Sequence, residues 1–95
     1  MLSIVAEPTG DVVYVHADSE GLEVLERAVA ALRESVAQGK CEHDHLFTEV
    51  CGGSELTETM LVQERRAGCT QVHHLKLYGW TDEWSKKHGL LQNAL

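Results

Sequence analysis

The chain is poor in basic residues, cysteine, proline and long apolar runs. Its 95 residues include 8 Lys and Arg against 15 Asp and Glu, a formal net charge of −7, and only one proline. With a hydrophobic content of 43%, this composition predicts a folded chain rather than a disordered one. No apolar run approaches the roughly 20 residues of a membrane helix, and the N-terminus lacks the basic and apolar regions of a signal peptide. We therefore predict one globular domain, residues 1–95, with no membrane partner.

The three cysteines give no disulfide framework. Cys41, Cys51 and Cys69 are odd in number and irregularly spaced. This usage fits free thiols in a reducing compartment, so the sequence predicts a cytoplasmic location.

Acidic charge is concentrated in the first two thirds of the chain. Residues 1–64 contain thirteen acidic and three basic residues, a balance of −10, whereas residues 65–95 contain two and five, a balance of +3. Binding to nucleic acid requires a basic surface, so we predict no nucleic-acid partner. The negative charge suits a basic protein partner, because its electrostatic field would accelerate the association of such a partner. The alternative is that acidity only keeps the protein soluble.

Short runs of β-branched and aromatic residues predict four strands. Residues 2–7 and 12–16 flank a turn-forming segment and predict a β-hairpin. A third strand is predicted over residues 43–49 and a long final strand over residues 71–80. Residues 59–65 suit either a strand or a short helix.

A helix is predicted over residues 19–38, and Asp18 or Ser19 can accept hydrogen bonds from its first free amides. A short helix is predicted to begin near Thr81 and to be interrupted at Gly89, with fraying last residues. The long helix has one aliphatic stripe, which can cover one face of a small antiparallel sheet. The predicted fold class is therefore α+β, a two-layer sandwich with a short C-terminal helix and one open sheet face. The stripe consists of Leu22, Leu25, Val29, Leu32 and Val36.

Four of the six histidines lie in two of the predicted strands. Strand alternation places His43 and His45 on one face, whereas the adjacent His73 and His74 face opposite ways. Such imidazoles can bind zinc, but no complete ligand set follows, so we predict no metal and no other cofactor. The alternative function is a small histidine-rich metal-binding or hydrolytic protein. The simpler interpretation is that these histidines hydrogen-bond carbonyl or carboxylate groups.

The sequence contains no catalytic motif. The segment Gly52-Gly53-Ser54 is too short for a phosphate-binding loop and lacks its lysine. We therefore predict that the protein is not an enzyme. Tyr78 and Trp80 share one face of the predicted final strand, where they suit either the core or a protein interface.

Three segments resemble a known family in their order and spacing. They are residues 42–48 (EHDHLFT), 52–57 (GGSELT) and 72–80 (VHHLKLYGW), and the resemblance also includes residues 15–22. In these segments the chain resembles immunity protein family thirty-two of bacterial polymorphic toxin systems. The resemblance implies a non-enzymatic protein that binds and blocks a cognate toxin inside the producing cell. The matching positions are His16, Asp18, Asp44, His45, Gly52, Gly53, Glu55, Leu56, His73, His74 and Trp80.

The resemblance and the acidic charge together suggest which residues bind the partner. Acidic residues around the glycine pair are expected to steer a toxin with a basic active site, such as a nuclease, and the two aromatic residues are expected to anchor it. A homodimer formed through the open sheet face is a further alternative. The predicted partner-binding residues are Glu42, Asp44, His45, Glu49, Glu55, Glu58, Tyr78 and Trp80.

Overall fold

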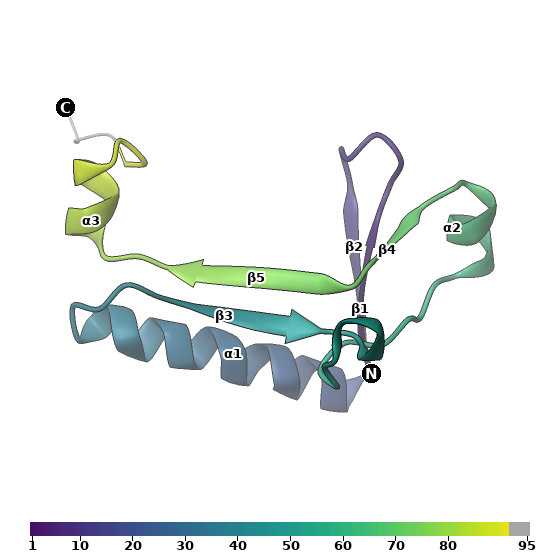
Figure 1. Cartoon of the computed structure of the whole chain (residues 1–95), viewed down its shortest axis with the longest axis horizontal. Coiled ribbons are helices and arrows are strands. Elements are labelled where there is room, and N and C mark those ends of the chain that lie inside the picture. Colours follow the sequence, from purple (N-terminus) through teal and green to yellow (C-terminus); the bar gives the residue numbers. More distant parts are fainter. Residues whose placement is uncertain (92–95) are drawn as a thin grey trace.

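The computed structural model describes residues 1–91. The predicted fraying of the last residues concerns residues 92–95, which lie outside the described residues. The chain has an α+β fold with antiparallel strand pairing, one long helix and a short C-terminal helix, as predicted (Figure 1). The elements in order are β1 (Leu2–Ala6), β2 (Val13–Ala17), α1 (Ser19–Ala37), β3 (Glu42–Phe47), the 3-10 turn η1 (Glu49–Cys51), α2 (Val62–Arg66), β4 (Thr70–Val72), β5 (His74–Gly79) and α3 (Asp82–Lys87).

The strands form two sheets rather than the single sheet that was predicted. The hairpin β1–β2 is confirmed and pairs with β4 in the order β2-β1-β4, while β3 and β5 form a separate pair. The predicted strand over residues 71–80 is wrong, because the chain leaves one sheet after Val72 and enters the other at His74. His73 is held at this junction by Thr48, whose N–H donates to the His73 carbonyl at 3.0 Å and whose Oγ1 lies 2.8 Å from His73 Nδ1.

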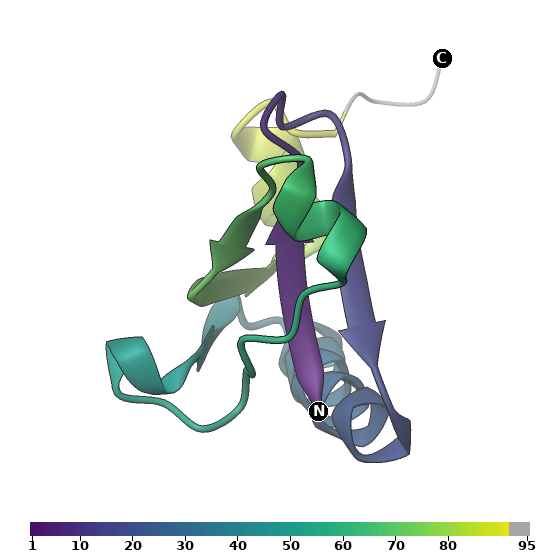
Figure 2. The same ribbon diagram turned by 90° about the vertical axis from the view of Figure 1, so that its right-hand side faces the viewer.

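The hydrophobic core forms around β1, which lies between α1 and the segment that precedes α2 (Figure 2). Leu2, Ser3, Ile4 and Val5 are all buried. On one face, Leu2 and Ile4 join the core cluster with residues of α1, β3 and β5. On the other face, the Ser3 hydroxyl donates to the carbonyl of Thr59 at 2.6 Å. Burial of both faces explains why β1 is an almost continuous apolar run.

Helix α1 begins in close contact with the start of β1. The Asp18 side chain accepts a hydrogen bond from the Gly21 N–H at 2.9 Å and pairs with the N-terminal ammonium of Met1. Gly21 is buried, and a Cβ at this position would lie 1.7 Å from the Met1 carbonyl oxygen. The absence of a side chain therefore allows the helix to approach the strand this closely.

The molecule is extended for its length. Its principal dimensions are 45 × 27 × 23 Å and its radius of gyration is 15.8 Å. A compact domain of this size has a radius of gyration of about 12 Å. Much apolar surface stays accessible, including Val13 and Val15 on β2 and Leu22 and Val29 on α1. Among residues 1–91, no helix is both long enough and apolar enough to cross a bilayer.

The contact between Gly21 and Met1 reverses the usual effect of a Gly→Ala change in a helix. Alanine normally stabilises a helix interior by up to about 1 kcal/mol. We expect Gly21→Ala instead to lower the free energy of unfolding by about 1–3 kcal/mol, because the new Cβ overlaps backbone atoms. Urea denaturation followed by circular dichroism measures this change. Glu23→Ala on the exposed side of α1 is the control, and a Gly21→Ala variant as stable as the parent protein would contradict the packing.

Candidate partner-binding site

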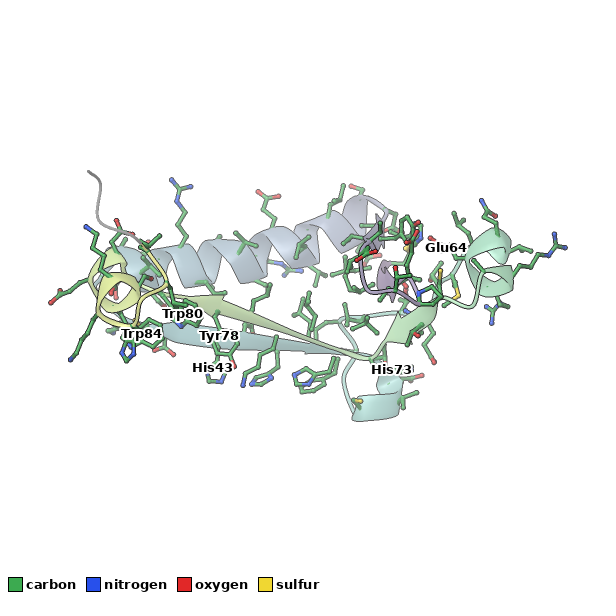
Figure 3. The ribbon with its side chains drawn as sticks, turned by 90° about the horizontal axis from the view of Figure 1, so that it is seen from above. His43, Glu64, His73, Tyr78, Trp80 and Trp84 are labelled. Atoms are coloured by element: carbon green, nitrogen blue, oxygen red, sulfur yellow. The ribbon has the colours of Figure 1, made fainter. Side chains whose placement is uncertain are left out.

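The β3–β5 pair is covered by α1 on one face only. Leu46, Leu75 and Leu77 face the helix and contribute to the core cluster. Side chains of the alternate positions point away from α1, as the labelled His43 and Tyr78 show (Figure 3). The alternation predicted for these histidines is therefore confirmed, and the open face carries His43, His45, Phe47, His74, Lys76 and Tyr78.

A continuous series of rings runs along this open face and onto α3. We call it the aromatic row. Neighbouring ring centroids are 4.1–5.7 Å apart, so each ring is in contact with the next. Tyr78 and Trp80 are neighbours at 5.4 Å, so their predicted shared face is confirmed, and Lys76 places its ammonium 5.0 Å from the Tyr78 ring. The row consists, in spatial order, of Phe47, His74, His45, His43, Tyr78, Trp80, Trp84 and His88.

Two imidazoles of the row share a hydrogen bond. His45 Nδ1 lies 2.7 Å from His74 Nε2, so one ring donates and the other accepts through an unprotonated nitrogen. Partial burial, together with the nearby His43, His74 and Lys76, holds the pKa of His45 below its ordinary value. The lowered pKa favours the uncharged form of His45 at neutral pH.

Acidic residues gather around Ser54, beside the edge of β3. Ser54 lines two adjacent depressions of about 430 and 290 Å³. The first also contains Asp44, His45 and Glu55 from the predicted site, and the second contains Glu49 and Glu58. Because His45 belongs to both the first depression and the aromatic row, the acidic group and the row border one another along β3.

Glu55 has a structural role within this group. Its carboxylate accepts hydrogen bonds from the Phe47 N–H at 3.2 Å and the Ser54 N–H at 3.1 Å. A hydrogen bond from its own backbone N–H, together with these two bonds, holds the pKa of Glu55 below its ordinary value. A Cβ at Gly53 would lie 2.6 Å from this carboxylate, and Gly52 has a φ of +86°, so the glycine pair is required by the local backbone.

The remaining predicted residues lie towards the other end of the strand pair. Glu42 stands opposite Gly79 and lines neither depression, so the structure separates it from the other acidic residues. Tyr78 and Trp80 are 51% and 38% exposed, respectively, which makes them available to a partner. The predicted partner-binding residues omit five members of the row, which are His43, Phe47, His74, Trp84 and His88. Only the Trp84-x-x-x-His88 spacing on α3 gave a local indication that these two rings stack.

Two further residues on which the resemblance described above rests, His16 and Leu56, have structural roles. Glu64 is buried and both of its carboxylate oxygens lie 2.9 Å from His16 Nε2. Burial opposes ionisation of Glu64, but the hydrogen bonds from Leu61 N–H and His16, with the charge of His16, keep its pKa below the ordinary value. Leu56 lies in the core. His16 and Leu56 therefore act through packing and hydrogen bonding.

The structure does not assemble a ligand set for the metal-binding alternative. Among residues 1–91, no three His, Cys, Asp or Glu side chains are placed to hold one metal ion. His45 and His74 direct their facing nitrogens at each other. Cys41 and Cys51 are exposed free thiols, and Cys69 is a partly buried one.

We expect Glu55→Ala to lower the free energy of unfolding by about 1–2 kcal/mol, because two backbone N–H groups lose their acceptor. Since the folded-state pKa of Glu55 is lowered, its contribution is complete above its unfolded-state pKa and is lost as the pH falls through the folded-state pKa. Urea titrations across acidic pH measure both effects. Glu49→Ala, at an exposed acid nearby, should change neither; equal behaviour of the two variants would contradict a structural role for Glu55.

In comparisons with protein-family models, curated proteins and solved structures, the chain matches none of them.

Proposed function

We propose that this chain is a cytoplasmic immunity protein that binds a cognate bacterial toxin stoichiometrically and neutralises it without catalysing a reaction. The observation that carries the proposal is the exposed aromatic row beside the acidic group around Ser54. An accessible group of aromatic side chains with charged residues at its border has the composition of a protein interface. The resemblance of residues 42–57 and 72–80 to immunity protein family thirty-two supports the same function.

The two parts of the site have different roles in this proposal. Tyr78 and Trp80 provide rigid apolar surface, which gives binding energy and slows dissociation. Glu49 and Glu58 are exposed, and Glu58 makes only a long contact of 3.9 Å with His73 Nδ1, so both serve to attract a basic toxin surface over a distance. Glu55 positions the loop that carries this charge.

Co-expression with toxin genes adjacent to its own gene tests the proposal directly. We expect one toxin to be neutralised and to co-purify in a 1:1 ratio of chains. Tyr78→Ala and Trp80→Ala should each raise the dissociation constant about tenfold or more, mainly through faster dissociation, as measured by surface plasmon resonance. Val62→Ala removes an exposed apolar side chain outside the site and is the control. Failure of every neighbouring toxin to bind would refute the function.

The acidic group should act on the association rate. The double variant Glu49→Lys/Glu58→Lys is expected to slow association several-fold at low salt, with a smaller difference at high salt. Asp11→Lys/Glu23→Lys changes the net charge by the same amount at exposed positions away from the group. Equal slowing by both double variants in stopped-flow measurements would show that only net charge matters.

A further inference from the structure

The two edges of the β3–β5 pair differ in their hydrogen bonding. At the β3 edge, the Phe47 N–H donates to Glu55, the Phe47 carbonyl accepts from Leu56 N–H at 3.0 Å, and the His45 N–H donates to Asp44 at 2.8 Å. The part of this edge around His45 and Phe47 is therefore satisfied within the chain. A strand edge protected in this way does not pair with another strand.

The β5 edge is open. Thr48 hydrogen-bonds His73, so the register directs the backbone groups of residues 75, 77 and 79 towards β3 and those of His74, Lys76 and Tyr78 outwards. Among residues 1–91, no hydrogen bond engages these outward N–H and carbonyl groups. An unpaired row of this kind is a template for a further strand.

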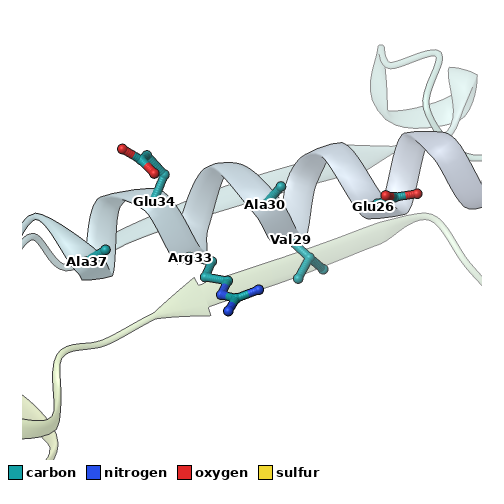
Figure 4. A pocket seen from close by; sticks show the side chains of 6 residues that line it. All are labelled: Glu26, Val29, Ala30, Arg33, Glu34 and Ala37. Carbon is teal, nitrogen blue, oxygen red and sulfur yellow. The ribbon is translucent and has the colours of Figure 1, made fainter.

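An apolar groove of about 370 Å³ runs beside the open edge, between α1 and β5. It continues over the outer side of α1, where Val29 and Arg33 line both the groove and a second depression (Figure 4). Val29 is 50% exposed although it belongs to the aliphatic stripe of α1. The groove is lined by Val29, Leu32, Arg33, Val36, Leu77, Tyr78, Gly79 and Trp80.

We propose that the β5 edge pairs with the β5 edge of a second copy of this chain, giving a four-stranded antiparallel sheet with two α1 helices on one face. Helix α1 packs on both β3 and β5. Strands lie about 4.8 Å apart, so two helices that each cover two strands lie about 10 Å apart. This distance matches the 8–10 Å of packed helices. The dimer would cover the groove and give the extended monomer a larger core.

Charge favours a register centred on Leu77 over one centred on Lys76. Antiparallel pairing of the outward groups aligns even-numbered residues with even-numbered residues. Pairing centred on Lys76 would place two ammonium groups opposite each other, which is unfavourable. Pairing centred on Leu77 instead places Lys76 opposite Tyr78 of the second copy, a favourable cation–π arrangement.

The same centre gives complementary charges between the helices. Gly79 lies above Leu32 and Val36, each of which would be 3.2 Å from a Cβ at that position. Leu77 precedes Gly79 by two residues, or about 6.6 Å along β5. This distance corresponds to four to five residues of α1, which runs in the same direction as β5 (Figure 4). The two-fold axis therefore passes near Val29 and Ala30.

Around this axis the antiparallel helices place Glu26 of one copy opposite Arg33 of the other, twice, with Val29 and Ala30 between the two pairs. Both charged residues are exposed, and within residues 1–91 no ion pair engages either of them. Strand register, helix spacing and side-chain charge thus agree on one arrangement of two identical chains. A second copy accordingly fits this edge better than a strand of arbitrary sequence.

Sedimentation velocity of the protein alone, across a concentration series, tests the proposal independently of any toxin. We expect a dimer, and we expect Glu26→Arg and Arg33→Glu each to weaken it about tenfold or more by opposing like charges. The double variant Glu26→Arg/Arg33→Glu should restore it. Lys76→Pro removes an outward N–H and should give a folded monomer, whereas Lys76→Ala keeps that N–H and should remain dimeric.

Circular dichroism verifies that each variant is folded, and Leu22→Arg is the control for a charge added to exposed apolar surface of α1 outside the groove. A parent protein that is monomeric at every concentration would refute the dimer. A dimer insensitive to Lys76→Pro, or a charge-swapped double variant that stays monomeric, would refute this arrangement of it. Toxin binding that requires the β5 edge of a monomeric protein would assign the edge to the toxin instead.

Discussion

Burial of β1 on both faces is the constraint on which the structure depends. Leu2 and Ile4 connect this strand to α1 and the β3–β5 pair, while Ser3 connects it to the segment before α2. The close approach of α1 at Gly21 follows from the same packing. Since the core contains few fully buried residues, small losses around β1 represent a large share of the stability.

Local sequence patterns predict the elements but not the division into two sheets. The spacing of aliphatic residues in α1 and the turn before β2 depend only on neighbouring residues, so both can be predicted directly from the sequence. The break at His73 depends on Thr48, twenty-five residues earlier, and on β1 at the start of the chain. No local feature distinguishes residues 71–80 from one continuous strand, because both halves have strand-forming residues.

The candidate site could likewise be predicted only where it depends on local sequence patterns. Alternation correctly gave the faces of His43, His45, Tyr78 and Trp80. Sequence proximity grouped the acidic residues around the glycine pair. It did not reveal that the Glu55 carboxylate accepts hydrogen bonds from backbone amides. The aromatic row joins three separate segments, so its continuity becomes visible only with the pairing of β3 and β5. In this row all four histidines make ring contacts, and His45 and His74 also share a hydrogen bond.

The separation of paired strands along the chain also determines when each part can form. The β1–β2 hairpin and α1 need only the first 37 residues, whereas β3 finds its partner only when β5 is available. β4, which completes the first sheet, immediately precedes β5. Loop closure over these distances slows folding relative to local pairing. During synthesis, therefore, β3 leaves the ribosome as an unpaired strand, and both sheets are completed almost together by one late segment.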